Sequence, residues 1–132
     1  MLRAVLESIV FNHRVHIEAL RRGLSFSEAR LTGGPSRNPV FAQLFADILG
    51  MLVTMTQTDE AAAWGAALCA GAAVGLYASP QDDPRDLDSL CTTFTPDASR
   101  TKDYEARYRL FCKLSGTIAP LWPEIEALGS AI

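Results

Sequence analysis

Cysteine is scarce in this sequence and is not arranged to bind a metal. The three cysteines, Cys69, Cys91 and Cys112, are widely spaced, and no two of them form a CxxC pair. A zinc ribbon or a thioredoxin-like site therefore has no support. An odd number of cysteines is typical of a reducing compartment. The N-terminal segment has an acidic Glu7 inside its apolar pattern and lacks the cleavage site of a secretory signal, so we expect a cytoplasmic protein.

Clustered positive charge is missing as well. The net charge is −3, the pI is about 5.3, and the lysines and arginines form no basic stripe. Because such a stripe is the usual footprint of nucleic-acid binding, we expect no nucleic-acid partner. His13 and His16 are three residues apart on an expected helix, but Glu18 lies elsewhere on the helical wheel and no third ligand is evident. We therefore predict no metal site there.

A long apolar run without charge occurs at residues 61–78, and it consists mainly of alanine. Its length approaches the ~20 residues of a membrane-spanning helix. Three glycines, Gly65, Gly71 and Gly75, raise the cost of keeping it helical. The small residues favour a helix buried closely against a sheet or another helix, with Trp64 and Tyr77 as core or interface residues. We therefore predict no membrane span.

What the sequence does contain is typical of one globular domain. A chain of 132 residues, 48% hydrophobic and 20% charged, is long enough to bury a core and is not disordered in composition. Its centre predicts a strand at 29–32, a helix at 39–49 and a strand at 52–55. Such βαβ units build parallel sheets. We expect an α/β fold with a short parallel sheet packed by several helices.

The other segments are expected to be mainly helical. Residues 2–22 predict a helix with one apolar face, made of Leu2, Val5, Leu6, Ile9, Ile17 and Leu20. A further helix is expected from residue 60 to about 78. Residues 79–102 contain three prolines and predict a surface excursion with one short helix near 87–91. Residues 103–128 predict a helical tail with an apolar stripe, made of Tyr104, Tyr108, Phe111, Leu114 and Ile118.

The turn between the first strand and its helix is the candidate site. Gly33 and Gly34 follow the strand, and Asn38 is a good N-cap for the helix. Backbone N–H groups and the positive end of a helix at such a turn suit an anion, with Ser36 and Arg37 as candidate phosphate contacts. A tight turn and a solvated loop explain the same residues, because short glycine motifs have a high false-positive rate.

The carboxylates show no acid–base arrangement. Asp47 is expected to be a paired surface carboxylate or to contact the neighbouring strand. Asp59 and Glu60 stand where a helix is expected to begin, and acidic residues are favoured there by the helix dipole. We therefore expect these two residues to cap that helix.

Taken in order, the motifs resemble a known family. The pattern GG-x-x-x-N at 33–38 is followed by Gln43, by Ala-Asp-x-x-Gly at 46–50 and by Glu-x-x-Ala-x-Gly-Ala-Ala at 60–67. This succession resembles the C-terminal part of the FGGY carbohydrate kinases, which phosphorylate sugars and polyols, and the likeness extends over essentially the whole chain. That family belongs to the actin, hexokinase and Hsp70 ATPase superfamily. The resemblance implies that residues 1–132 form a single domain, part of a ribonuclease-H-like domain.

The resemblance also implies roles for the candidate residues. Gly33 and Gly34 would approach the adenosine and α-phosphate of ATP, and Asn38 would match the adenine-contacting position. Glycine suits close approach of a nucleotide because it has no Cβ atom. Pro35 has no N–H and leaves the loop one donor fewer. ATP and Mg²⁺ would be cofactors of the complete enzyme, and a sugar or polyol its substrate.

Parts of the family pattern have no counterpart in this sequence. These are the glycine-rich phosphate loop of the first domain, the aspartate that acts as base on the sugar hydroxyl, and the first strands of the second domain. We therefore expect a fragment that shows no kinase turnover alone and that associates with a missing N-terminal part or with a second copy. A non-catalytic, self-associating module is the alternative function, and a small α/β protein that binds another anion is a third.

Overall fold

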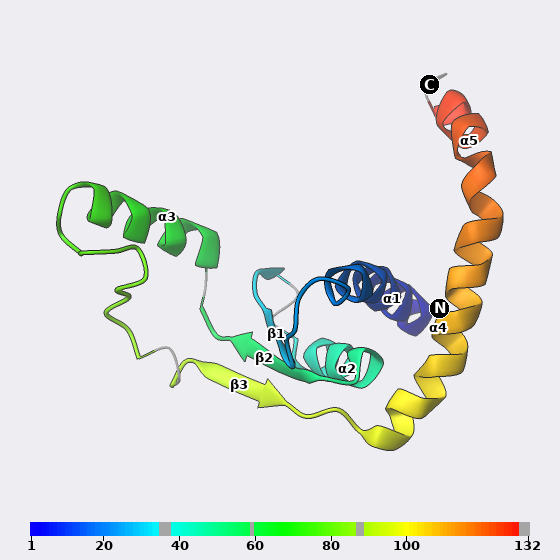
Figure 1. The fold of residues 1–132 in the computed structure, drawn as a ribbon, viewed down its shortest axis with the longest axis horizontal. Coiled ribbons are helices and arrows are strands. Elements are labelled where there is room, and N and C mark those ends of the chain that lie inside the picture. The colour runs from blue at the N-terminus through cyan, green and yellow to red at the C-terminus, as the bar shows by residue number, and fades with distance from the viewer. Residues whose placement is uncertain (35–37, 59, 87–88, 130–132) are drawn as a thin grey trace.

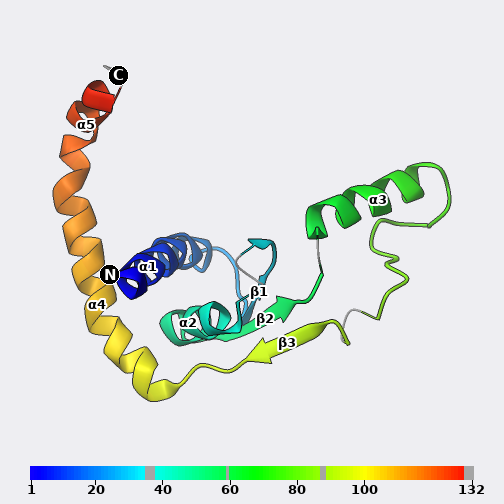
Figure 2. The ribbon, with the colours of Figure 1, turned by 180° about the vertical axis from the view of Figure 1, so that it is seen from behind.

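The computed structural model describes residues 1–34, 38–58, 60–86 and 89–129. Two segments project from a compact centre (Figures 1 and 2). One is α3 with the loop after it, and the other is α4 with α5. The elements in chain order are α1 (Leu2–Leu20), β1 (Glu28–Leu31), α2 (Pro39–Leu49), β2 (Leu52–Thr56), α3 (Ala61–Ala73), β3 (Cys91–Phe94), α4 (Ala98–Ile118), the 3₁₀ turn η2 (Ala119–Leu121) and α5 (Trp122–Gly129).

The sheet has three strands in the order β1-β2-β3. Strands β1 and β2 run parallel, with Glu28 opposite Leu52 and Leu31 opposite Met55, and α2 is the crossover between them. This confirms the predicted βαβ unit. Strand β3 runs antiparallel to β2, with Val53 opposite Phe94, so the sheet is mixed rather than purely parallel.

Strand β3 corrects the expectation for residues 79–102. The surface excursion contains a strand, and the short helix expected near 87–91 is wrong where the structure describes it. Ser89 and Leu90 form a turn, and Cys91 begins the strand. The segment Cys91–Phe94 has two β-branched threonines and a phenylalanine, which suit a pleated and half-buried surface.

The core lies between α1, α2, α4 and the sheet. Ile48, Val10 and Val53 are its largest fully buried apolar side chains. Phe11 of α1 packs against Tyr104, Tyr108 and Phe111 of α4, with ring centroids 6.2, 5.9 and 5.5 Å away. The first part of the predicted tail stripe is therefore buried or half-buried, whereas Leu114 and Ile118 are exposed.

The buried face of α1 differs from the predicted one. Four residues of the expected apolar face, Leu2, Val5, Ile9 and Leu20, are exposed. The face that packs against α2 and α4 instead contains Glu7, Val10 and Phe11. The buried face was hard to identify because it includes a carboxylate, which hydrophobic periodicity counts as a solvent position.

Arg14 joins α1 to α2 and α4. Its guanidinium lies 4.0 Å from the ring centroid of Tyr108, donates to the carbonyl of Ile48 at 3.2 Å, and pairs with Glu105 at 2.5 Å and with Glu18 at 2.9 Å. The hydroxyl of Tyr108 donates to the same Glu18 at 2.9 Å. Burial raises the pKa of the Tyr108 phenol, and the hydrogen bond to Glu18 adds to that rise. Tyr108 therefore stays neutral and keeps its donor.

Helix α3 is shorter and more exposed than predicted. It ends at Ala73 rather than near 78. Gly75 has φ +77°, its N–H donates to Ala72, and the N–H of Leu76 donates to Gly71, which is a Schellman termination. Only Leu68 and Gly71 of the helix are buried, so the expected buried helix is wrong for this chain. No helix in the described ranges is long and apolar enough to cross a membrane.

A polar cluster holds the loop after α3 against the start of that helix. The indole N–H of Trp64 donates to Asp83 at 2.9 Å, and the guanidinium of Arg85 lies 4.2 Å from the Trp64 ring centroid. Arg85 also pairs with Asp83 at 2.6 Å and donates to Thr58 at 3.2 Å. The hydrogen bonds from Arg85 hold the pKa of Asp83 well below its usual range. Trp64 therefore packs on a loop rather than in the core.

Candidate functional site

The glycine turn lies at the carboxyl end of β1. The strand ends at Leu31, and Gly33 follows with φ +84°, a left-handed conformation that glycine adopts without strain. A Cβ atom added at Gly33 or Gly34 would meet nothing within 4 Å. Because β1 and β2 are parallel, the turn after β1 and the junction between β2 and α3 lie at the same edge of the sheet. Ligands of open α/β sheets bind at this carboxyl edge.

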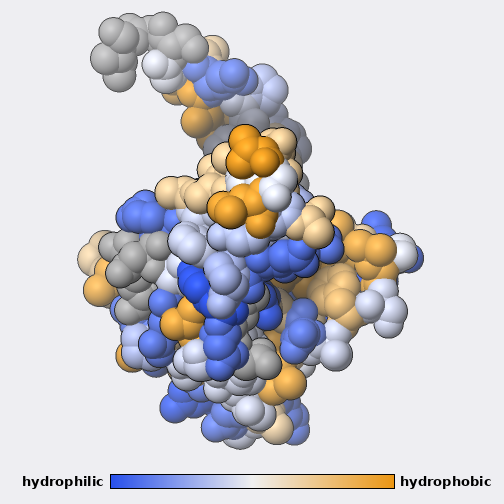
Figure 3. Space-filling view, turned by 90° about the vertical axis from the view of Figure 1, so that its left-hand side faces the viewer, coloured by the Kyte–Doolittle hydropathy of each residue, from blue (hydrophilic) through white to orange (hydrophobic). Residues whose placement is uncertain are grey.

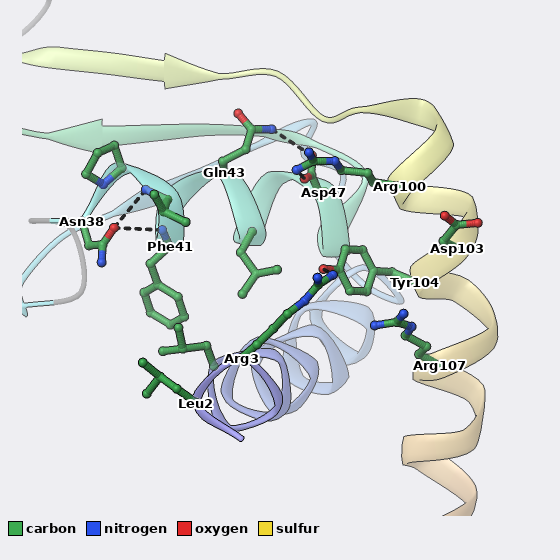
Figure 4. A pocket seen from close by; sticks show the side chains of 14 residues that line it. Leu2, Arg3, Asn38, Phe41, Gln43, Asp47, Arg100, Asp103, Tyr104 and Arg107 are labelled. Carbon is green, nitrogen blue, oxygen red and sulfur yellow. Dashed lines mark hydrogen bonds and ion pairs between the residues drawn. The ribbon is translucent and has the colours of Figure 1, made fainter.

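Asn38 opens the helix that follows the turn. Its Oδ1 accepts hydrogen bonds from the N–H groups of Val40 at 2.9 Å and Phe41 at 3.3 Å (Figure 4). Pro39 occupies the first helical position, where an N–H has no intrahelical partner. The predicted N-cap is confirmed. Backbone N–H groups already occupy the side-chain oxygen of Asn38. A contact between Asn38 and a ligand would therefore be made by the side-chain NH₂, as a donor.

Gly33 and Gly34 follow the end of β1, and Asn38 caps the beginning of α2. Ser36 and Arg37, the two candidate phosphate contacts, lie outside the described residues, as does Asp59. Helix α3 begins at Ala61, and Glu60 stands at its N-cap position with φ +53°. Its side chain makes no capping hydrogen bond, so the expected side-chain cap at Glu60 is wrong.

A groove of about 930 Å³ begins at Asn38 and runs between α1, α2 and α4. Its lining includes apolar side chains such as Leu6 and Leu44. Three arginines reach it, Arg3 from α1 and Arg100 and Arg107 from α4 (Figure 4). The groove was not predicted, because its walls come from segments about a hundred residues apart in sequence.

Each of these arginines is held by a buried carboxylate. Glu7 accepts from Arg3 at 2.7 Å, from the hydroxyl of Tyr104 at 3.1 Å and from Arg107 at 3.3 Å. Burial alone would raise the pKa of Glu7, but the hydrogen bonds from Arg3 and Tyr104 and the charges of Arg107 and Arg3 outweigh it and lower that pKa. Glu7 therefore stays ionised at neutral pH.

Asp47 has the same role for Arg100. It is 2% exposed and accepts from Gln43 at 2.8 Å, from the backbone N–H of Asp97 at 3.0 Å and from Arg100 at 3.4 Å. The expected surface carboxylate is therefore wrong. Asp47 pairs with Gln43 on α2 and with Asp97 and Arg100 at the beginning of α4. An acidic residue inside the apolar run 44–49 is the signal in the sequence that points to a buried carboxylate.

Residues 1–74 match the family model described as the C-terminal domain of the FGGY family of carbohydrate kinases. The chain belongs to this family. The predicted resemblance is therefore confirmed, and the α/β architecture with its parallel β1–β2 pair agrees with a partial actin-like ATPase fold.

Relatives of this FGGY domain are full-length kinases. The chain is 32% identical over 112 residues to the L-xylulose/3-keto-L-gulonate kinase of Escherichia coli, which covers 84% of this chain and 22% of the relative. It is 43% identical over 90 residues to a glycerol kinase of Dechloromonas aromatica, covering 67% of this chain and 17% of that kinase. The chain thus spans about a fifth of the length of these relatives.

Solved FGGY kinases share the fold. A xylulose kinase from Lactobacillus acidophilus superposes with a TM-score of 0.74 at 20% identity, over 93% of this chain and 25% of that one. A xylulose kinase from Rhodospirillum rubrum gives a TM-score of 0.65 at 28% identity, over 90% of this chain and 24% of that one. The elements of this FGGY domain therefore match a quarter of a larger enzyme.

Proposed function

We propose that this chain is the ATP-binding portion of a carbohydrate kinase and that the turn at Gly33 and Gly34 faces the nucleotide. In the complete enzyme, the γ-phosphoryl group of ATP would pass to a hydroxyl of a sugar or polyol. The observation that carries the proposal is the open space beside both glycines, at the carboxyl edge of β1 and next to a capped helix. Among the described residues, no side chain would meet a Cβ atom placed at either glycine, which leaves room for a nucleotide at this turn.

The residues of the chain suit binding rather than transfer. Asp103 lines the groove and is exposed. Two further described carboxylates near the groove, Glu7 and Asp47, are both occupied by arginines and buried donors. Neither has a free position for taking a proton from a sugar hydroxyl. The described residues contain no group of three His, Cys, Asp or Glu side chains that could hold a metal. In the complete enzyme, Mg²⁺ would be held mainly by the nucleotide phosphates.

Replacing Gly34 with valine is expected to weaken ATP binding by about tenfold or more while leaving the fold intact. The valine side chain would occupy the open space where the nucleotide is proposed to lie. Isothermal titration with ATP at millimolar concentration measures the effect. The same preparation is expected to show no sugar phosphorylation, because the proposal assigns the catalytic base and the sugar site to other parts of the complete enzyme.

Gly23→Val is the matched control, because a Cβ atom at Gly23 also meets nothing within 4 Å and Gly23 follows α1, outside the turn. Its ATP affinity should equal that of the unchanged chain. Absence of ATP binding by the unchanged chain would reject the nucleotide site and favour the structural module. Binding of inorganic phosphate without preference for ATP would favour the third function, a site for another anion.

Asn38→Asp separates capping from nucleotide contact. Aspartate is as good an N-cap as asparagine, so α2 should keep its stability within about 0.5 kcal/mol. The substitution removes the NH₂ donor and adds a negative charge, so ATP affinity should fall several-fold. Thermal unfolding followed by circular dichroism measures the first quantity, and titration measures the second. Unchanged ATP affinity would place Asn38 away from the nucleotide.

A further inference from the structure

Helix α3 and the loop after it project from the sheet (Figures 1 and 2). Only two residues of the helix, Leu68 and Gly71, are buried. Gly71 is covered by that loop, since a Cβ atom added to it would lie 2.8 Å from the ring of Tyr77. On the side of the molecule that the helix and loop occupy, polar and apolar surface is intermixed (Figure 3). The orientation of α3 therefore depends on contacts at its beginning rather than on packing against the sheet.

Those contacts converge on Arg85, which lies in the loop that leads to β3. Its Nη1 donates to the hydroxyl of Thr58 at 3.2 Å, and its Cζ lies 4.2 Å from the ring centroid of Trp64. Its Nη2 pairs with Asp83 at 2.6 Å, and Asp83 also accepts from the indole N–H of Trp64 at 2.9 Å. We call Thr58, Trp64, Asp83 and Arg85 the Arg85 cluster. One side chain thus joins the end of β2, the first turn of α3 and the returning loop.

Asp83 holds the guanidinium of Arg85 in one orientation. Its Oδ1 accepts from the backbone N–H and from the Nε of Arg85, both at 3.0 Å, while its Oδ2 accepts from Nη2. The side chains of Asp83 and Arg85 are 8% and 27% exposed, so salt and water screen this pair less than a surface pair. Two parallel N–H donors on one carboxylate fix the plane of the guanidinium, which a lysine cannot reproduce. The N–H that reaches Thr58 therefore has a set direction.

Thr58 lies at the same edge of the sheet as the glycine turn. Leu31 of β1 is opposite Met55 of β2, and the two strands are parallel. Gly33 follows Leu31 by two residues and Thr58 follows Met55 by three, so both come at the carboxyl ends of neighbouring strands. Ligands of open α/β sheets bind outside these carboxyl ends. A nucleotide at the glycine turn would therefore lie beside the residues that Arg85 holds.

We propose that Arg85 is a positioning residue for the nucleotide site. Through its contacts with Thr58 and Trp64, it holds the end of β2 and the beginning of α3 beside the glycine turn and does not itself contact ATP. This role rests on the proposed function, because it takes the glycine turn as the place where ATP binds. A protein whose binding-competent arrangement is only partly populated binds its ligand more weakly in proportion to that fraction. Loss of the Arg85 contacts should therefore lower the affinity for ATP.

Arg85→Met tests the role, because methionine keeps an apolar contact with Trp64 but has neither the charge nor the N–H donors of arginine. The affinity for ATP, measured by isothermal titration, should fall about fivefold. Arg22→Met is the matched control, since Arg22 is exposed after α1 and its replacement removes the same charge. It should bind ATP as tightly as the unchanged chain. Arg85→Lys should recover only part of the lost affinity, because lysine lacks the planar fork.

Thr58→Val shows whether Arg85 acts through Thr58. Valine has the shape of threonine without the hydroxyl that accepts from Arg85. If that hydroxyl serves to receive Arg85, Thr58→Val should also weaken ATP binding. The double variant should then bind ATP no more weakly than Arg85→Met alone, because both changes remove one interaction. Losses of affinity that add in the double variant would reject this route, since two independent effects add.

Titration of the unchanged chain with ATP separates the failure of this inference from the failure of the proposed function. If the unchanged chain binds ATP and Arg85→Met binds it equally well, the positioning role is wrong and the nucleotide site stands. If Gly34→Val and Arg85→Met both weaken binding, while the Gly23→Val and Arg22→Met controls do not, both stand. Absence of ATP binding by the unchanged chain would reject the nucleotide site and the role of Arg85 together.

Discussion

Phe11→Ala should destabilise the protein by about 3–5 kcal/mol, the largest effect that we expect from a single substitution. Phe11 is 6% exposed, and its ring contacts Tyr104, Tyr108 and Phe111, which are the residues that hold α4 on the body. Removal of the ring leaves a cavity between α1 and α4 in addition to the lost burial. Chemical denaturation at a fixed protein concentration measures the change in the free energy of unfolding.

Val5→Ala is the control for that experiment. Val5 lies on the same helix and is 55% exposed, so its truncation should change the free energy of unfolding by at most about 0.5 kcal/mol. Equal losses for Val5→Ala and Phe11→Ala would mean that the apolar face predicted from the sequence, and not the face seen in the structure, is the buried one.

The parts of the fold that could be predicted from the sequence are local ones. The βαβ unit is specified by short apolar runs, by Asn38 and Pro39 at the beginning of α2 and by Gly50 at its end, and all of these signals lie within about 30 residues. The glycine turn is part of the same local pattern. For this reason the sequence alone points to Gly33, Gly34 and Asn38 as the candidate site.

The parts that could not be predicted depend on distant partners. Glu7 is buried because Tyr104, 97 residues later, donates to it, and Asp47 is buried because the chain returns at Asp97, 50 residues later. Periodicity assigns such carboxylates to solvent. Periodicity also predicts that Leu114 and Ile118 of α4 are packed, although both are exposed, since exposure depends on which other segments lie beside them. Strand β3 was missed for a similar reason, because its hydrogen bonds go to β2, 35–41 residues earlier.

Through these distant contacts, α4 holds α1 and α2 together. Its first half is fixed at two buried carboxylates, Asp47 on α2 and Glu7 on α1, and the aromatic contacts of Phe11 lie between α1 and α4. The second half of α4 and α5 extend directly from this first half (Figure 1). The direction of the second half of α4 is therefore set by the contacts of its first half with α1 and α2.

Glu7→Gln should destabilise the protein by about 2–3 kcal/mol at pH 7. The glutamine keeps the shape of the side chain but lacks the charge that Arg3 and Arg107 contact. The solvent-facing arginines, 73% and 54% exposed, can turn to water, which keeps the loss below that of a fully buried ion pair. Urea unfolding at pH 7 measures the loss in the free energy of unfolding. Glu28→Gln, an exposed site on β1, is the control and should change the stability little.

The pH dependence of the free energy of unfolding shows whether the charge of Glu7 causes the loss of stability in Glu7→Gln. The folded-state pKa of Glu7 lies below the ordinary value of 4.5, so its ionised form contributes stability above about pH 4.5 that is lost as the pH falls through the folded pKa. Glutamine does not titrate. The difference in the free energy of unfolding between the two proteins should therefore be constant from pH 8 to about pH 5.5 and should shrink below pH 4.5. If this difference in the free energy of unfolding stays constant down to pH 3, the shape of the Glu7 side chain, and not its charge, is what stabilises the contact between α1 and α4.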